Sequence, residues 1–178
     1  MADILIVVAT EQEAEHIFGK KFKAGKGKVI RLASASTVHN YDLLITGPGI
    51  VSTTWWMSQY LQNHSYRLAV NLGICGSSDP DIQPVRVVQI TSDRFADFGS
   101  ETSSSHLDSF DLGFEKPNSF PYRDGWLMKN FKKKLNCLSA IPAVSGVTLN
   151  LCTGTEKRKK LLINKYGIGM ESMEGAAF

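Results

Sequence analysis

The segment ILIVVAT, residues 4–10, constrains the fold more than any other part of the chain. It is apolar and mostly β-branched, without alternation between apolar and polar positions. A strand with one face in solvent alternates, whereas a strand buried on both faces of a sheet reads as a continuous apolar run. The segment therefore predicts a strand in the middle of a sheet that is covered on both faces.

Strand and helix patterns then alternate along the chain. Thr10 and Glu13 have the spacing of a capping box at the start of a first helix. Ser52 or Thr53 is expected to cap the second helix, and Gly167 to end the last one. Further strands are predicted at 28–36, 41–50, 67–77, 85–97 and 141–151, and further helices at 51–64, 126–135 and 154–167. This order predicts an α/β fold with helices on both faces of the sheet.

Residues 98–125 interrupt the pattern, because they are polar and rich in Ser, Asp and Gly. They predict a long loop or a pair of short hairpins. A connection of this length in a compact domain is often a lid or a mobile functional segment. At 178 residues, the whole chain is expected to form one domain.

The charge is too low to predict a nucleic-acid partner. The net charge is +3, and the basic residues fall into short runs at 19–28, 129–134 and 156–160. No aromatic residues alternate with these runs, so they are interpreted as solvated surfaces. The histidines and cysteines lack the spacing of metal ligands, so neither a metal nor another cofactor is expected.

The cysteines and the N-terminal region indicate a cytoplasmic protein. Cys75, Cys137 and Cys152 are odd in number and widely spaced, so they predict no disulfide framework. The apolar run near the N-terminus is short and is followed by acids, which is typical of a strand rather than a signal peptide. No apolar run has the length of a membrane span, so no membrane partner is expected.

Most predicted strands are followed by small or polar turns: ATEQE, TGPG, LGICGS and SGVTLN. In open α/β sheets, ligands bind at the carboxyl ends of the strands. Glycine after a strand usually marks only a turn, so each of these signals is weak alone. Together they predict a binding site at one edge of the sheet.

The stretches ATEQEAE, ITGPGIVSTTWW, VNLGICGS, SGVTLN and ESMEGAA occur in the order and spacing of a known superfamily. Across essentially its whole length the chain resembles the nucleoside phosphorylase/nucleosidase superfamily. Within it, the chain is most similar to the futalosine hydrolases of an alternative menaquinone pathway. It is more distantly similar to the methylthioadenosine/S-adenosylhomocysteine nucleosidases. The most specific motifs are residues 47–56 and the ending MEGAA.

The resemblance implies a three-layer fold with a mixed, twisted central sheet. It implies a nucleosidase that hydrolyses the N-glycosidic bond of a 5′-modified purine nucleoside, with futalosine as the first candidate. The products would be hypoxanthine and dehypoxanthine futalosine. Relatives form dimers or larger homo-oligomers, so the same is expected here. The 5′ group and the oligomer size are not predicted.

Two carboxylates are implied as catalytic. Met173 and Glu174 match the Met-Glu pair that meets the ribose, where the glutamate accepts hydrogen bonds from sugar hydroxyls. The alternative is a glutamate at a helix start, and the neighbouring Glu171 is expected to be peripheral. Glu13 matches the glutamate that orients the attacking water, a role that can coexist with the capping box. Glu11 is its nearest rival.

The motif NLGICG indicates a hydrolase rather than a phosphorylase. Phosphorylases of the superfamily carry an arginine and a hydroxyl residue where this chain has Asn71 and Ile74. Water is therefore the expected nucleophile. Ile74, Cys75 and Gly76 are expected to line the base and ribose pocket. Cys75 is interpreted as a small buried residue rather than a nucleophile.

The motif SGVTLN bears on the purine. Leu149 stands where adenosine-type nucleosidases carry a phenylalanine that stacks on the base, which argues against an adenine pocket. Asn150 follows it, and its amide can both donate to and accept from a hypoxanthine edge. The equal alternative for Asn150 is a turn-capping role.

Relatives continue past the position of Phe178 with a helix, a strand and a loop that carries the acid for the leaving base. The sequence is therefore expected to be an incomplete domain, without the last strand and helices, and to have low activity or none. Three alternatives stay open: a methylthioadenosine/S-adenosylhomocysteine nucleosidase, a purine nucleoside phosphorylase, and a nucleoside-binding module without catalysis. A fourth is an unrelated flavodoxin-like binding protein.

Overall fold

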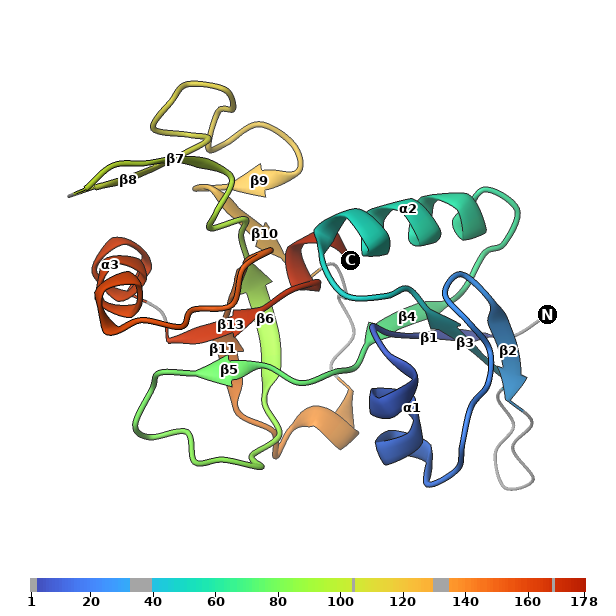
Figure 1. The fold of residues 1–178 in the computed structure, drawn as a ribbon. Coiled ribbons are helices and arrows are strands. Elements are labelled where there is room, and N and C mark those ends of the chain that lie inside the picture. The colour runs from blue at the N-terminus through green and yellow to red at the C-terminus, as the bar shows by residue number, and fades with distance from the viewer. Residues whose placement is uncertain (1–2, 33–39, 104, 130–134, 168) are drawn as a thin grey trace. The chain divides into compact units, whose positions relative to one another are not determined.

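The computed structural model describes residues 3–32, 40–103, 105–129, 135–167 and 169–178. The Cα positions group into two compact units. Unit 1 comprises residues 1–74 with 177–178, and unit 2 comprises residues 75–176. Figure 1 shows the elements of both units. The prediction of a single domain over 1–178 stays a prediction.

Unit 1 is built on a four-stranded sheet with the order β2-β3-β1-β4. β1 (Ile4–Val8) pairs in parallel with β3 (Tyr41–Ile45) and with β4 (Leu68–Asn71). The edge strand β2 (Val29–Leu32) is antiparallel to β3. The predicted buried first strand is thus the inner strand between β3 and β4, and its last four residues are buried.

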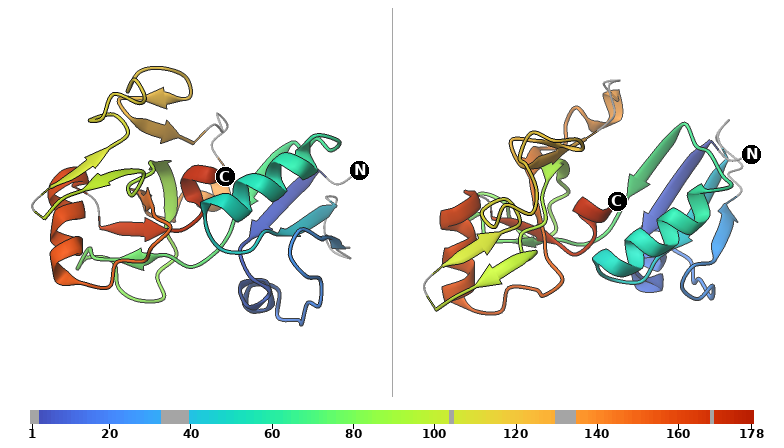
Figure 2. Two further views of the ribbon diagram at one scale, coloured as in Figure 1. Left: turned by 45° about the horizontal axis from the view of Figure 1, so that its top comes forward. Right: turned by 90° about the horizontal axis from the view of Figure 1, so that it is seen from above.

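Both faces of this sheet are covered by helices. Successive side chains of β1 point to opposite faces, so alternate residues pack with different helices. Ile6 and Val8 pack with Ala14 of helix α1 (Glu11–Phe18). Leu5 and Val7 pack with Met57 of helix α2 (Ile50–Leu61). The two views in Figure 2 show the two helices on opposite faces of the sheet. The continuous apolar run of residues 4–8 follows from this double burial.

The helix starts in unit 1 confirm one prediction and correct another. Thr10 caps α1, and the capping box with Glu13 is present. In α2, by contrast, the N-cap is Gly49, with φ 93°, and neither Ser52 nor Thr53 caps the helix. Thr53 is instead fully buried inside the helix. A glycine accepts the positive φ of this tight strand-to-helix turn without strain.

Unit 2 contains several small sheets rather than one. β6 (Gln89–Asp93) lies between β11 (Ala143–Ser145) and β10 (Trp126–Met128), and β9 (Tyr122–Arg123) completes that sheet. A second sheet has β13 (Met170–Ser172) between β12 (Val147–Thr148) and β5 (Gly76–Ser77). Parallel and antiparallel pairs occur in both sheets, so the expected α/β class with mixed strands is confirmed.

Helix α3 (Glu156–Tyr166) ends at Gly167, which adopts the left-handed conformation with φ 66°, as predicted. Its residues Leu162 and Tyr166 pack with Ala96, Val147 and Leu149 to form the core of unit 2. The described residues also form two short 3₁₀ helices, η1 (Asn136–Leu138) and η2 (Gly175–Ala177).

The polar segment 98–125 contributes to two hairpins, one of the two alternatives predicted. β7 (Gly99–Glu101) pairs with β8 (His106–Asp108), and β9 pairs with β10. The prediction of a helix from residue 126 is wrong, since 126–128 form strand β10. The predicted strand at 85–97 is also shorter, because the ladder begins at Gln89. Residues 33–36 and 130–134 of the predicted elements lie outside the described residues.

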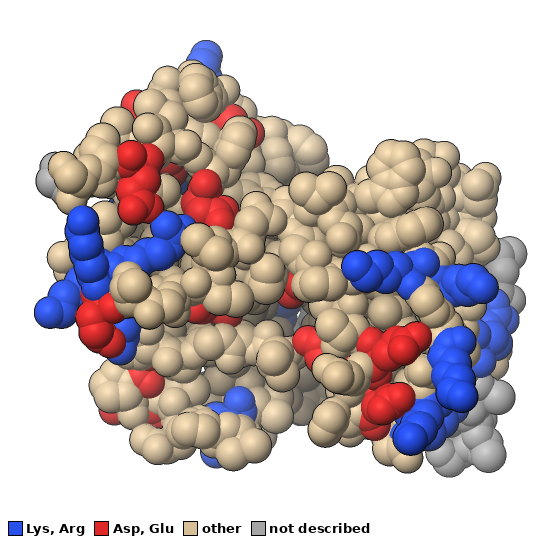
Figure 3. Space-filling model, in the orientation of Figure 1, with Lys and Arg blue, Asp and Glu red and all other residues tan. Residues whose placement is uncertain are grey.

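No helix among the described residues is long and apolar enough to cross a membrane. Figure 3 shows acidic side chains beside basic ones in each unit. The described residues also contain no group of three or more His, Cys, Asp or Glu side chains arranged to hold a metal ion.

Candidate functional site

Glu13 lies at the carboxyl end of the parallel strands of unit 1, in the first turn of α1. Its Oε2 accepts hydrogen bonds from the backbone N–H and the hydroxyl of Thr10, at 2.8 and 2.9 Å. Its Oε1 accepts the backbone N–H of Ile74 at 3.1 Å. The carboxylate therefore links the helix start to the turn that follows β4. The capping role is confirmed, and the catalytic role stays a prediction.

The turn beside Glu13 leaves little room for a side chain. A Cβ added at Gly73 would lie 2.8 Å from Glu13 Oε1, which is closer than real Cβ atoms approach other atoms. A larger residue at position 73 would therefore displace the end of the Glu13 side chain. Ile74 itself is 82% exposed, so its side chain does not pack in the core of unit 1.

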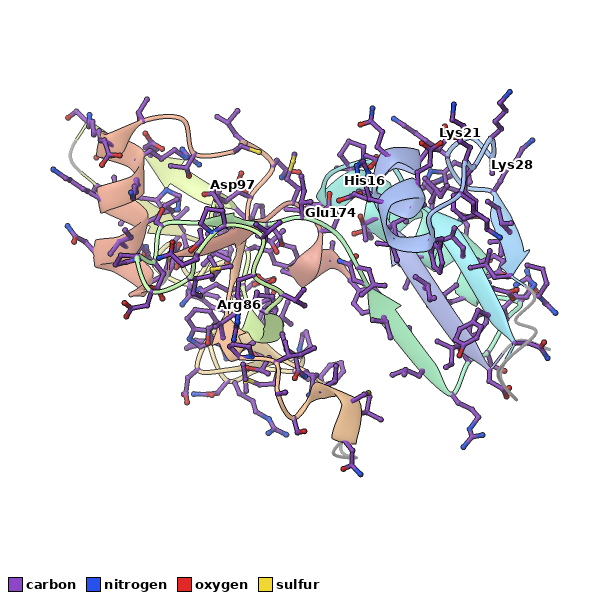
Figure 4. All side chains as sticks on the ribbon, turned by 90° about the horizontal axis from the view of Figure 1, so that it is seen from below. His16, Lys21, Lys28, Arg86, Asp97 and Glu174 are labelled. Carbon is purple, nitrogen blue, oxygen red and sulfur yellow. The ribbon has the colours of Figure 1, made fainter. Side chains whose placement is uncertain are left out.

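The two other glutamates of α1 have different partners. Glu11 Oε1 accepts the N–H of Ala24 at 3.0 Å, and Glu15 Oε1 accepts the N–H of Phe22 at 3.3 Å. Both carboxylates thus hold the basic loop that follows α1, which includes Lys21 and Lys28; Figure 4 marks these lysines. Only Glu13, of the three, accepts a hydrogen bond from the NLGICG turn, so its geometry separates it from its rival Glu11.

In unit 2, Met173 and Glu174 directly follow strand β13 and precede η2. Both are half-buried. Figure 4 marks Glu174 in the segment that leaves the strand. Met173 Sδ lies 3.7 Å from the Sγ of Cys152, which comes from the turn after β12. The pair thus lies at the carboxyl end of β13, which runs parallel to β12.

Glu171, the other glutamate of this stretch, is held within the sheet. It pairs with Val147 on one side and with Gly76 on the other. Its Oε1 accepts the backbone N–H of Thr153 at 3.2 Å. Gly76 packs against this side chain, since a Cβ at residue 76 would lie 3.0 Å from Glu171 Cγ. Glu171 therefore ties the strand to the turn after β12.

Cys75 precedes β5 and is exposed. The prediction that it is a small buried residue is therefore wrong. The turn that carries it projects from a two-residue strand and contributes nothing to the core cluster of unit 2. Partial desolvation raises the pKa of its thiol, which disfavours the reactive thiolate. The interpretation that Cys75 is not a nucleophile stays a prediction.

Leu149 and Asn150 differ in burial. Leu149 is 1% exposed and belongs to the core cluster of unit 2. Asn150 is exposed, and its backbone N–H donates to Asp97 Oδ2 at 2.6 Å. Leu149 is thus a core residue here, and its contact with a base stays a prediction, as does that of Asn150.

Three polar residues of unit 2 were missed from the sequence. Asp97, marked in Figure 4, accepts the backbone N–H groups of Asn150 and Leu151 and so fixes the turn after β12. Asp93 and Thr148 are buried, and the hydroxyl of Thr148 donates to Asp93 and accepts the backbone N–H of Ala176. Burial raises the pKa of Asp93 to about 6, although hydrogen bonds from Thr148 and from Arg94 N–H act in the opposite direction. The sequence signal was weak, because only Asp97 ends a predicted strand, whereas Asp93 and Thr148 lie inside the predicted strands 85–97 and 141–151 and end strands only in the structure.

Unit 2 has a surface hollow of about 480 Å³ over α3. Its lining includes Lys157, Lys160 and the buried His106, and contains none of the predicted site residues. A small cavity of about 10 Å³ near Glu171 has room for one water molecule at most.

Neither protein-family models nor curated protein sequences give a match to this chain. Solved structures do. The 5′-methylthioadenosine/S-adenosylhomocysteine nucleosidase of Helicobacter pylori matches with a TM-score of 0.71 and 17% identity, covering 98% of this chain and 75% of that chain. The S-adenosylhomocysteine nucleosidase of Streptococcus pyogenes matches with a TM-score of 0.69 and 15% identity, covering 99% and 75%.

A mutant of the futalosine hydrolase of Helicobacter pylori strain 26695 also matches, with a TM-score of 0.66 and 13% identity, covering 99% of this chain and 81% of that chain. These identities are low, but the matches extend over nearly the whole chain. Likeness at this level establishes the arrangement of the backbone rather than the substrate. The chain therefore has the fold of the nucleosidases and futalosine hydrolases that its sequence resembles.

Proposed function

We propose that this protein is a purine nucleosidase that hydrolyses the N-glycosidic bond of a 5′-modified nucleoside, with futalosine as the preferred substrate. The observation that carries this proposal is the setting of two carboxylates within a nucleosidase fold. Glu13 and Glu174 each follow the carboxyl end of a strand that has a parallel neighbour. Ligands of α/β sheets bind at such ends.

In the proposed reaction, water attacks C1′ of the ribose while the bond from C1′ to the purine nitrogen breaks. The electron pair of that bond leaves with the base. Glu13 accepts a proton from the attacking water, which is general-base catalysis. Its fixed hydrogen bonds to Thr10 and Ile74 support this role, because a base must be held in one orientation to act on a bound water.

Glu174 is proposed to accept hydrogen bonds from the ribose hydroxyls, and Met173 to pack on the sugar. The transition state of N-glycosidic cleavage has oxocarbenium character. Hydrogen bonds to the 2-hydroxyl strengthen in such a transition state. A carboxylate near that hydroxyl also stabilises the positive charge on the sugar ring. Ile74, Cys75, Gly76, Leu149 and Asn150 are proposed to complete the base and ribose pocket.

Water, rather than phosphate, is the proposed nucleophile. Asn71 and Ile74 stand where a phosphorylase would offer groups that hold phosphate. The first turn of α1 offers glutamates at positions 11 and 13 instead. Carboxylates at that turn repel a phosphate dianion. The phosphorylase alternative is therefore disfavoured, and a rate that depends on phosphate would restore it.

A methylthioadenosine/S-adenosylhomocysteine nucleosidase is the second candidate. It is favoured by structural neighbours named for that activity. Leu149 argues against it, because this position lacks the aromatic ring expected to stack on adenine. A nucleoside-binding module without turnover is the non-enzymatic candidate. Binding of futalosine with no release of base would support it.

We also propose that the protein forms a homodimer or a larger homo-oligomer. Val51 and Trp55 of α2 are 77% and 58% exposed, and large apolar side chains of this kind are common in subunit interfaces. Trp55→Lys would then weaken self-association. Sedimentation velocity that shows a monomer at all concentrations of the unchanged protein would contradict this.

The roles of the two carboxylates are tested by three matched substitutions. Glu13→Gln should lower kcat for futalosine by about 10²–10⁴-fold, since loss of a general base has this range of effect. Glu174→Gln should lower kcat/KM by about 10²-fold or more. Glu11→Gln is the control and should stay within a few-fold, because that carboxylate holds Ala24 instead. Equal losses in Glu11→Gln and Glu13→Gln would contradict the assignment.

A further inference from the structure

A buried hydroxyl group, that of Thr148, contacts the backbone that follows Met173 and Glu174. The Oγ1 of Thr148 accepts the backbone N–H of Ala176 at 2.8 Å and donates to Asp93 Oδ1 at 2.9 Å. Thr148 is 0% exposed, so these bonds are not exchanged with bulk water. One hydroxyl group therefore connects the backbone just after Glu174 to a carboxyl group of β6.

Thr148 is itself held firmly by the backbone around it. Its N–H donates to Arg94 O at 2.8 Å, and its C=O accepts the N–H of Ala96 at 2.9 Å. On its other side it pairs with Ser172 of β13. Because both flanks of Thr148 are fixed, the position of its hydroxyl varies little. The hydroxyl therefore offers a fixed acceptor to the backbone of Ala176, two residues after Glu174.

The amide groups that follow Glu174 both meet side-chain hydroxyls. Gly175 N–H donates to Ser172 Oγ at 3.2 Å, and Ala176 N–H donates to Thr148. Asp93 directs the Thr148 hydroxyl, because its Oδ1 accepts the hydroxyl proton and leaves an oxygen lone pair for Ala176. Asp93 Oδ1 also accepts the N–H of Arg94 at 2.7 Å, which fixes the carboxyl group.

The carboxyl group of Asp93 also lies directly beside Gly175, the residue after Glu174. A Cβ at Gly175 would lie 2.1 Å from Asp93 Oδ2. That oxygen is buried and has no hydrogen-bond partner among the described residues. The carboxyl group is thus in van der Waals contact with the glycine that follows Glu174. Only a glycine fits at residue 175 while Asp93 keeps this position.

We propose that Thr148 and Asp93 are positioning residues, which set the direction in which Glu174 meets the ribose. This inference rests on the proposed function. Their hydrogen bonds hold the backbone on the C-terminal side of Glu174, and the side chain of Glu174 follows that backbone. A displacement of about 1 Å in a catalytic group can cost about 10²-fold in rate. A purely structural role would instead lower stability without a specific effect on Glu174.

The first test compares two substitutions of one residue. Thr148→Val keeps the shape of the side chain but removes the hydroxyl, and should lower kcat/KM for futalosine by about 10–100-fold. Thr148→Ser keeps the hydroxyl and should restore most of the activity. The control is Thr91→Val on β6, whose hydroxyl donates to Val144 O at 3.2 Å rather than to the turn. Loss in all three variants alike would overturn the proposal.

The second test asks whether Thr148 acts through Glu174. In a Glu174→Gln background, Thr148→Val should cost less than about 3-fold, because the group that it positions is already impaired. The same fold loss in both backgrounds would show a role independent of Glu174. If Thr148→Val does not fold, Ser172→Ala tests the same segment in the same cycle, since it removes the acceptor of Gly175 N–H and the 3.4 Å contact with the Thr148 hydroxyl.

The third test needs no activity, so it separates this inference from the proposed function. Amide hydrogen exchange at Gly175 and Ala176 should be about 10-fold faster in Thr148→Val than in the unchanged protein, and unaltered in Thr148→Ser. If no base is released from any nucleoside but exchange changes in this way, the proposed function fails and the anchoring by Thr148 holds. Unaltered exchange in Thr148→Val overturns the inference.

Discussion

Glu13 performs two tasks with its two oxygen atoms. Oε2 completes the capping box with Thr10, while Oε1 reaches the N–H of Ile74. A capping box alone would satisfy the helix start and leave the second oxygen to solvent. In this chain the second oxygen is directed instead by the turn after β4. The helix cap thus serves as the fixed support of the proposed base.

Gly73 offers a way to move this carboxylate without changing it. Gly73→Ala would place a Cβ 2.8 Å from Glu13 Oε1, so the end of the glutamate must shift. We expect kcat for futalosine to fall by about 10-fold or more, because the base is misplaced. The free energy of unfolding should change by less than about 1 kcal/mol, since residue 73 is exposed and has no positive φ.

The control for that experiment is Gly25→Ala. It lies in the same unit and has nothing within 4 Å of its added Cβ. Steady-state kinetics and urea unfolding of both variants separate an effect on the base from a general loss of stability. A Gly73→Ala enzyme with unchanged kcat would show that the position of Glu13 is not critical.

The pKa of Asp93 predicts how the free energy of unfolding changes with pH. Burial raises its pKa to about 6 from an ordinary value of 3.8. The folded state therefore holds this proton more tightly than the unfolded state, and the resulting stability is lost as pH rises through 6. Between pH 5 and 7.5, the loss for this one group is about 1.4 kcal/mol.

Asp93→Asn should remove that component. The difference in unfolding free energy between variant and unchanged protein should therefore shift by about 1 kcal/mol between pH 5 and 7.5. The shift should favour the variant at the higher pH. Urea unfolding at both pH values measures it. A difference that does not depend on pH would mean that Asp93 titrates normally in the folded protein.

The sequence predicted contacts between residues that are close along the chain, but not contacts between residues that are far apart. Thr10 and Glu13 are three positions apart, so their capping box follows from the sequence alone. The partnership of Asp93 with Thr148 joins residues 55 positions apart. The exposure of Cys75 likewise depends on the turn around β5 rather than on residue type. Such features follow from tertiary packing, which no local pattern encodes.

At the scale of elements, the main difference from the structure is the helix predicted at 126–135, which begins as strand β10. Residues 126–135 have helical spacing, yet 126–128 pair with β6 and β9. The loop between β9 and β10 is Asp124–Gly125, and both residues have positive φ, of 50° and 78°. An Asp-Gly pair of this kind is the signature of a two-residue hairpin turn. The Asp-Gly pair thus indicates a hairpin, and the strand pairing of residues 126–128 overrides their helical spacing.

The guanidinium of Arg94, whose side chain is 12% exposed, links the hairpins of unit 2 to α3. Arg94 donates to Asp108 Oδ2 at 2.7 Å, and Asp108 is 2% exposed. The guanidinium also lies over the rings of Phe110, Trp126 and Tyr166, at 5.3, 5.1 and 4.6 Å from their centroids. Lys165 forms ion pairs with Asp108 and Asp111 beside it. One arginine thus joins β6, β10, α3 and the segment after β8.

Arg94→Ala should therefore destabilise the protein by roughly 3–5 kcal/mol, because it leaves a buried carboxylate without its main partner. Lys159→Ala is the matched control. Its ion pair with Glu156 is exposed and 3.8 Å long, so its loss should cost about 0.5 kcal/mol or less. Urea unfolding of both variants gives the comparison. Similar small losses would show that the Arg94 cluster contributes little.

At the scale of the molecule, the sequence predicted the α/β class because the β1–α1 and β3–α2 successions carry strong local signals. It did not predict that unit 2 has several small sheets. β5, β9 and β12 have two residues each, which is too short for a periodic pattern. The motifs singled out the carboxylates Glu13 and Glu174, whereas the contact of Thr148 and Asp93 with the backbone after Glu174 follows only from the structure.

In the proposed reaction, water cleaves a purine from a 5′-modified nucleoside. The most direct measurement is base release in phosphate-free buffer, with futalosine and methylthioadenosine as separate substrates and chromatography to identify the product. We expect hypoxanthine from futalosine, no dependence on added phosphate, and loss of release in Glu13→Gln. Release that requires phosphate, or no base from either nucleoside, would contradict it.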